Sequence, residues 1–292
     1  MIQRASSVGE LARKFLSRGG RGTVTRVFDR SAYVKAGSDF ILLLWSKGRS
    51  PMTINITEGD MGVEGLKAGE ACELGPARLR ARHVEVAVED TPDYRSSLQR
   101  KGTIVLPAPD DLVKGVAMLR SLYDASPHGP ALVTDPLFRS FARARLVPAA
   151  GGTAKLGFDD FLGLVGRGGG FTPAGDDFTA GFTAVSNYIA RSRGRRPIVI
   201  PKGLSSRTVP ESAAIMAYSS RGYVDEGMER LILDSLGGRR FSDDLVSLAS
   251  RGHTSGMDMS LGALLAEAVE SGKKDRGRTL RRGLEALWPV GR

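Results

Sequence analysis

The feature that most constrains the fold of this 292-residue chain is a change in the spacing of its apolar residues. Between Thr23 and about Val88, short alternating or β-branched runs such as TVTRVF and HVEVAVE are separated by Gly, Pro, Ser and Asp. Such runs, joined by tight turns like AGSD, predict antiparallel strands that form a curved sheet or small barrel. From Leu112 onward the apolar residues recur with the helical period. We therefore predict an α+β protein, β-rich in its N-terminal part and mostly helical in its C-terminal part.

The change of period also predicts two domains. We place the β-rich domain at residues 1–106. It starts with a short helix, on which Val8, Leu11 and Phe15 share one apolar face. The helical domain then covers residues 107–292. Beyond the helix that starts near Leu112, helices are expected near 157–165, 173–191, 209–220, 224–236, 242–250, 256–271 and 275–287. The run PIVIP, with a proline at each end, suggests an edge strand or an extended linker among them.

Composition narrows the function classes. Cys72 is the only cysteine, so an internal disulfide is excluded, and its surroundings predict a small apolar strand residue. The longest apolar run, FILLLW, is too short to cross a bilayer. The N-terminus lacks the apolar segment of a secretory signal, so a cytoplasmic location is expected.

The net charge of +10 raises the prospect of an anionic partner. The basic residues are spread along the chain, and dense runs such as KKDRGRTLRR contain no aromatic residues that would stack bases. A solvated surface explains them better than nucleic-acid binding.

The stretch GRGGGFTPAGDDFTAG, from Gly166 to Gly181, is the best candidate for a ligand site. Thr172 and Pro173 suit the N-cap and first position of a helix, which places Asp176 and Asp177 in its opening turns. Two explanations account for these aspartates and the glycines before them. The aspartates complement the helix dipole in a purely structural turn, or the glycine N–H groups bind an anion while the aspartates hold Mg²⁺ or orient a hydroxyl or amine. The spacing fits neither a Walker A loop nor a dinucleotide-binding fingerprint.

Two other predicted helix starts resemble this one. Thr208 and Glu211 form a capping-box pattern preceded by Arg207, and Ser255 and Asp258 repeat that spacing after His253. If the three helix starts converge, their N–H groups, with Arg207 and His253, make a cradle for a small carboxylate, carbamoyl or phosphate group. A Ser-His-Asp triad among Ser255, His253 and Asp258 is disfavoured, because residues so close in sequence at a helix start rarely reach one another correctly.

These three blocks carry a resemblance to a known family. The glycine-rich stretch resembles the G-x-G-x-G-L-T-P-S/A-G-D-D signature of the AllH-like family, with Phe171 where Leu is usual and Gly169 where Pro is common. SSRTVPESAAIMAYSSRG and GHTSGMDMSLGALL resemble further blocks of that family, and the likeness covers most of residues 22–270. The resemblance places a site at the following positions: Gly168, Gly170, Thr172, Asp176, Asp177, Thr208, Ser212, His253, Ser255 and Gly256.

The resemblance also implies an activity. It suggests a subunit of an oxamate carbamoyltransferase that works with FdrA-like partner subunits and handles oxamate, oxalurate and carbamoyl phosphate. In that case Asp176, Asp177 and His253 would be the catalytic candidates, with Mg²⁺ on the two aspartates as a further expectation. The alternative is a non-catalytic regulatory or structural subunit that docks an FdrA-like protein through the glycine loop.

Overall fold

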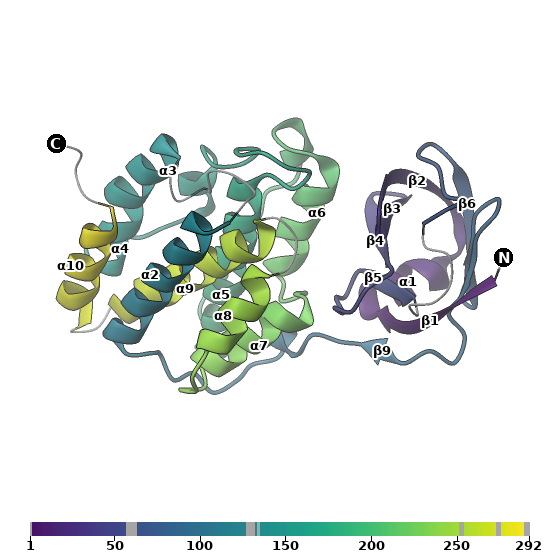
Figure 1. The fold of residues 1–292 in the computed structure, drawn as a ribbon. Helices are drawn as coiled ribbons and strands as arrows, with labels where there is room; N and C mark the ends of the chain where they lie inside the picture. The colour runs from purple at the N-terminus through teal and green to yellow at the C-terminus, as the bar shows by residue number, and fades with distance from the viewer. Residues whose placement is uncertain are drawn as a thin grey trace. The chain divides into compact units, whose positions relative to one another are not determined.

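In the computed structural model, the described residues are 2–56, 63–126, 132, 135–250, 254–272 and 276–288. The chain divides into two compact units (Figure 1). The first comprises Met1–Ser96 and Tyr223–Glu226, and the second comprises Ser97–Gly222 and Gly227–Arg292. This division places residues 97–106 with the helical unit, whereas the sequence prediction placed the boundary after residue 106. That the two parts fold as independent domains stays a prediction.

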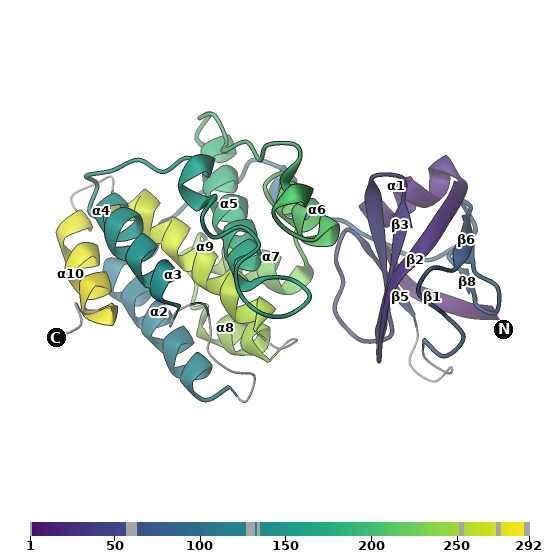
Figure 2. The ribbon, with the colours of Figure 1, turned by 90° about the horizontal axis from the view of Figure 1, so that it is seen from above.

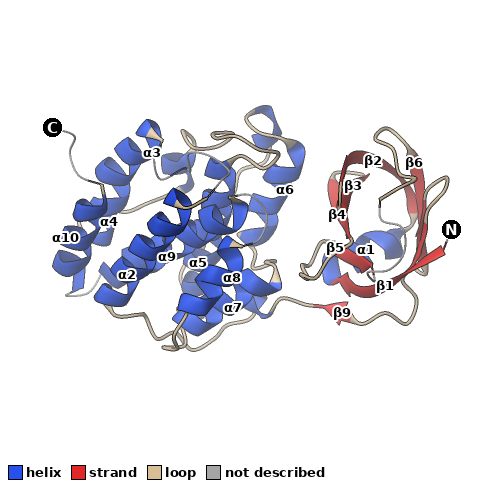
Figure 3. Ribbon diagram, viewed as in Figure 1, coloured by secondary structure: helices blue, strands red, loops and turns tan. Residues whose placement is uncertain are grey.

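The first unit is a curved β-sheet, and helix α1 (Glu10–Arg18) packs against one end of it (Figures 2 and 3). Among the described residues, nine strands follow the order β5-β4-β3-β2-β6-β7-β8-β1-β9, and β5 also pairs with β1, which closes the sheet. The strands are β1 (Ile2–Gly9), β2 (Gly20–Phe28), β3 (Ser31–Ala36), β4 (Asp39–Leu44), β5 (Thr53–Ile56), β6 (Ala71–Leu74), β7 (Arg78–Arg80), β8 (Glu85–Ala87) and β9 (Asp93–Tyr94). The prediction of a β-rich N-terminal part followed by a helical part is confirmed.

Two details of the first unit differ from the prediction. Strand β1 was not expected, and the predicted helix begins only at Glu10. Strand β1 pairs in parallel with β8, and β4 pairs in parallel with β5, although most neighbouring pairs are antiparallel. Strand β6 buries Cys72, and burial raises the pKa of its thiol to about 11, which agrees with a small apolar role.

The second unit is helical, with α5 (Ala174–Ser192) and α9 (Ser255–Ser271) packed against each other in its middle (Figures 1 and 2). Helices α2, α4 and α8 contact α9, and α6 contacts α5. The surrounding helices are α2 (Pro109–Asp124), α3 (Pro136–Phe141), α4 (Val147–Ala150), α6 (Pro210–Ser219), α7 (Glu226–Ser235), α8 (Ser242–Ala249) and α10 (Gly277–Leu287). None of the described helices is long and apolar enough to span a membrane.

Glycines allow the two central helices to approach closely. A Cβ atom built on Gly181 would lie 2.0 Å from the Met259 carbonyl oxygen, and one on Gly262 would lie 2.1 Å from the Phe178 carbonyl oxygen. Because neighbours cover α5 on every side, all residues from Ala174 to Ala190 are buried.

Two of the remaining expectations are resolved. The helix expected near 157–165 reduces to one 3₁₀ turn at Phe158–Phe161 followed by turns. The run from Pro197 to Pro201 forms no strand and is an extended linker, held at Ile198 by two hydrogen bonds with the Asn187 amide, at 2.6 and 2.8 Å.

Candidate functional site

The N-terminal end of α5 meets the start of α9 through a pair of hydroxyl groups. The Thr172 hydroxyl donates to Asp177 Oδ2 at 3.0 Å, and it lies 2.9 Å from the Ser255 hydroxyl. Since Thr172 has one hydroxyl hydrogen, Ser255 donates to Thr172 when Thr172 donates to Asp177. Helix α5 begins at Ala174 with Pro173 at the N-cap, so the prediction of Thr172 as its N-cap is wrong. Thr172 instead connects two segments that are 83 residues apart.

Asp176 connects the same helix to the glycine loop and to the segment before α6. Its Oδ1 accepts the Gly166 N–H at 2.7 Å, and its Oδ2 accepts the Thr208 hydroxyl. Helix α6 begins at Pro210 with Val209 at the N-cap, so the predicted Thr208–Glu211 capping box is also wrong. Burial raises the pKa of Asp176, while the hydrogen bond from Thr208 lowers it.

The third predicted helix start follows the same pattern. Thr254 is the N-cap of α9, and no side chain caps that helix, so the Ser255–Asp258 capping box is wrong. Asp258 accepts a 2.6 Å hydrogen bond from the Tyr123 hydroxyl of α2. Sequence reasoning missed Tyr123, although it extends the apolar face of Leu112, Val116 and Leu119 by one further turn. A tyrosine on the buried face of a helix needs a hydrogen-bond partner for its hydroxyl, so the sequence already indicated a polar group near Tyr123.

Asp176, Asp177 and Asp258 are 1%, 4% and 0% exposed. The pKa of Asp177 is raised to about 8: burial raises it most, the charges of Asp258 and Asp176 also raise it, and the Ser255 and Thr172 hydroxyls lower it. Burial likewise raises the pKa of Asp258 to about 7, against the hydrogen bond from Tyr123. Because burial disfavours the charged form and the neighbouring carboxyls add to this effect, a pKa of about 8 leaves Asp177 mainly protonated at neutral pH, in the range suited to proton transfer.

The glycines of the loop have two different roles. Gly166, Gly168 and Gly170 have φ angles of 76°, 103° and 94°, which favour glycine. A Cβ atom on Gly166 would lie 2.1 Å from the Arg207 carbonyl oxygen, so this glycine is required by packing. Gly168 to Gly170 are exposed, and no described residue accepts a hydrogen bond from their N–H groups. A small open depression adjoins Gly166 and Gly168.

The remaining candidates are distributed as follows. Arg207 is exposed, whereas Ser212 and Gly256 are buried. His253 lies outside the described residues. The described part of the chain holds no group of three or more His, Cys, Asp or Glu residues that would hold a metal ion. Both oxygens of Asp176 accept protein hydrogen bonds and Asp177 is buried; Mg²⁺ on these two aspartates stays a prediction.

A buried carboxyl cluster at the junction of three helix starts, beside exposed glycines, defines a candidate site for a small polar ligand. Residues 164–267 match the model of a family described as AllH, oxamate carbamoyltransferase subunit AllH. The match spans the glycine loop and all three helix starts, and it confirms the resemblance over this segment. No curated protein and no solved structure gives a significant match to the chain.

Proposed function

We propose that this chain is a subunit of a carbamoyltransferase that binds a small carbamoyl, carboxylate or phosphate-bearing ligand beside Gly168–Gly170. The observation that carries the proposal is the convergence of the three motif segments: Thr172 contacts Ser255, and Asp176 contacts Thr208. The family match over residues 164–267 supplies the reaction class. The convergence alone would support a ligand site without naming its chemistry.

The exposed N–H groups of the loop would bind the anionic part of the ligand. They stand just before the N-terminal end of α5, where the helix dipole favours negative charge. Thr172 and Ser255 are half-buried at the same place, and a hydroxyl that turned from its protein partner to the ligand would donate to it. In carbamoyl transfer, such donors stabilise the oxyanion that develops on the carbamoyl carbonyl, an effect of about 3 kcal/mol per donor in known cases.

Asp177 would supply the proton that the reaction requires. When a phosphate oxygen attacks the carbamoyl carbon of oxalurate, the bond from that carbon to the oxamate nitrogen breaks, and this nitrogen takes up a proton. With a pKa of about 8, Asp177 carries a proton at neutral pH that it can donate and later recover. The roles of His253 and Arg207 in this scheme stay predictions.

A second candidate is a non-catalytic subunit that docks an FdrA-like partner. One observation favours it: Gly166 is required by packing against Arg207, and both oxygens of Asp176 are used by the fold. Part of the motif thus has a structural explanation that needs no ligand. This candidate predicts a stable complex with the partner that survives loss of both aspartates.

The test is turnover by the enzyme assembled with its partner subunit. Asp177→Asn should lower kcat by at least about 100-fold, because Asn has no acidic proton to donate. The fold should persist, since Asn has the shape and charge of the protonated carboxyl. Asp159→Asn, which changes an exposed aspartate of the same unit, should leave kcat unchanged. An Asp177→Asn enzyme with wild-type kcat would reject the catalytic role and favour the non-catalytic subunit.

A further inference from the structure

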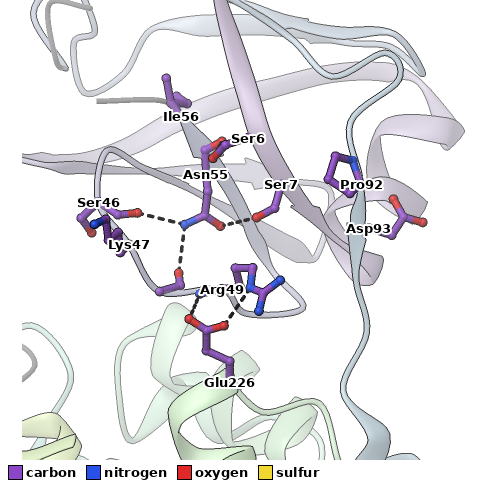
Figure 4. A pocket seen from close by; sticks show the side chains of 11 residues that line it. Ser6, Ser7, Ser46, Lys47, Arg49, Asn55, Ile56, Pro92, Asp93 and Glu226 are labelled. Atoms are coloured by element: carbon purple, nitrogen blue, oxygen red, sulfur yellow. Dashed lines mark hydrogen bonds and ion pairs between the residues drawn. The ribbon is translucent and has the colours of Figure 1, made fainter. Parts of the chain in front are cut away.

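Two cavities of the first unit differ in how their polar groups are used. The cavity in Figure 4 is lined by Asn55, Arg49 and Glu226, among others. Asn55 accepts the Ser7 hydroxyl at 3.1 Å and donates to two backbone carbonyl oxygens, and Arg49 pairs with Glu226 at 2.7 Å. The fold itself satisfies these groups, so they give no reason to expect a ligand.

The second cavity lies on the outer face of the sheet, at β2, β6 and the end of β7, and its residues lie outside the family match. It measures about 630 Å³, within the size range of small-molecule sites. Exposed and buried residues alternate along β6 and β7, so Glu73 and Arg80 face outward while Cys72 and Leu79 face the interior. Three arginines are among the lining residues: Arg21, Arg80 and Arg82.

The strand register places two of these arginines on either side of one carboxylate. Arg21 of β2 is the register partner of Glu73 of β6, and Glu73 is the register partner of Arg80 of β7. Because neighbouring strands lie about 4.8 Å apart, the Cα atoms of Arg21 and Arg80 are roughly 10 Å apart. Residues in register share a face of the sheet, so both guanidinium groups flank the same part of the cavity.

Arg82 is held in place through its backbone. Its N–H donates to Glu70 Oε1 at 2.6 Å, and the other carboxylate oxygen of Glu70 accepts the Lys67 N–H at 3.2 Å. Glu70 directly precedes β6, so this bond fixes Arg82 beside Ala71, which also lines the cavity. The position of Arg82 is therefore set without the use of its guanidinium group.

The charges of this cavity are mostly unpaired, unlike those of the first. Among the described residues, the Arg21 and Arg82 guanidinium groups and the Glu73 carboxylate have no hydrogen-bond or ion-pair partner. Arg80 lies 3.7 Å from Glu85, which also pairs with a second arginine at 3.2 Å, so one carboxylate serves two cations. The cavity therefore carries a positive charge that the described protein groups do not neutralise.

We propose that this arginine-lined cavity binds the phosphate groups of a small molecule. A planar guanidinium group donates two parallel hydrogen bonds to a phosphate. A phosphate group carries nearly two negative charges at neutral pH, whereas a carboxylate carries one, so phosphate matches the two unpaired guanidinium groups better. The proposal does not depend on the glycine-loop site, because all lining residues lie between Arg21 and Arg82.

Calorimetric titration of the full chain with pyrophosphate tests the site, in about 0.1 M salt to screen long-range attraction. The wild-type chain should bind pyrophosphate, and Arg21→Met or Arg82→Met should each weaken the binding about tenfold, because charge-assisted hydrogen bonds are lost. Glu73→Gln should tighten the binding about threefold, because it removes a repulsive charge from the cavity. Arg30→Met, at an exposed arginine in the turn after β2, should bind as the wild type does.

The same titration separates this proposal from the glycine-loop site. Binding that survives in Thr172→Val and is weakened by Arg21→Met supports the cavity, whatever the outcome for carbamoyl transfer. Binding that is lost in Thr172→Val and unaffected by Arg21→Met overturns the cavity proposal and leaves the proposed function standing. Absence of pyrophosphate binding to the wild-type chain, or equal weakening by Arg30→Met and Arg21→Met, also overturns it. The changed side chains are exposed, so the melting temperatures of the arginine variants should equal that of the wild type.

Discussion

Asp177 is the residue whose environment departs most from that of an ordinary aspartate. It is buried beside two other carboxyls, and burial is the largest of the effects that raise its pKa to about 8. An unfolded chain would give the same group a pKa of about 3.9. Between about pH 4 and pH 8, Asp177 therefore keeps its proton in the folded state and releases it in the unfolded state.

This difference makes the stability of the protein depend on pH. The contribution of Asp177 is fully present below about pH 4 and is lost as the pH rises through about 8, because the folded state holds the proton more tightly. We expect the melting temperature to fall between pH 5 and pH 9. In Asp177→Asn the melting temperature should decrease less over this pH range, since Asn does not ionise. Asp258 and Glu267, whose pKa values are raised to about 7 and about 8, contribute to the fall in the same direction.

Melting curves of the wild type, Asp177→Asn and Asp159→Asn across this pH range check the prediction. The exposed Asp159 serves as the control and should leave the wild-type dependence intact. A wild type whose melting temperature stays constant or rises towards pH 9 would contradict the description of Asp177.

At this scale, sequence reasoning singled out hydroxyl and carboxyl side chains that contact one another in the structure, but it assigned the hydroxyls the wrong partners. Thr172 and Thr208 were expected to bind the N–H groups of their own helices, yet they donate to Asp177 and Asp176. A local pattern shows that a hydroxyl needs a partner. It does not show that the Asp176 carboxylate, 32 residues away in the chain, will reach the Thr208 hydroxyl first, because that depends on tertiary packing.

At the scale of elements, the contact between α5 and α9 decides where the motif segments lie. The backbones meet at Gly181 and Gly262, where any side chain would clash with a carbonyl oxygen of the opposite helix. Helix periodicity predicted both helices closely, at 173–191 and 256–271. It did not predict that they pack together, because two buried helices give no separate apolar face from which a partner could be inferred.

Gly262→Ala tests this contact. The new methyl group would lie 2.1 Å from the Phe178 carbonyl oxygen, so the helices must separate, and we expect the free energy of unfolding to fall by about 2 kcal/mol or more. Gly163→Ala is the matched control, because a Cβ atom there meets no atom within 4 Å. Denaturant unfolding of both variants measures the difference. Equal stability of the two variants would show that the helices are not packed at this glycine.

At the scale of the whole molecule, the change of apolar period predicted the α+β organisation, and the structure confirms it. The point at which the apolar spacing changes also gave the approximate place where the strands end and the helices begin. It did not reveal that Tyr223–Glu226, more than 100 positions further along the chain, belongs with the β-rich unit. A short segment of that kind leaves no periodic signal, because its placement depends on single contacts such as the ion pair between Arg49 and Glu226.

The central claim is that the three motif segments form one site for a small anion beside Gly168–Gly170. A crystal soaked with carbamoyl phosphate or oxamate tests it most directly. We expect ligand density against the N–H groups of these glycines and within hydrogen-bond distance of Thr172 or Ser255. A fully occupied ligand elsewhere in the crystal, with only protein atoms around Thr172 and Asp177, would contradict the claim.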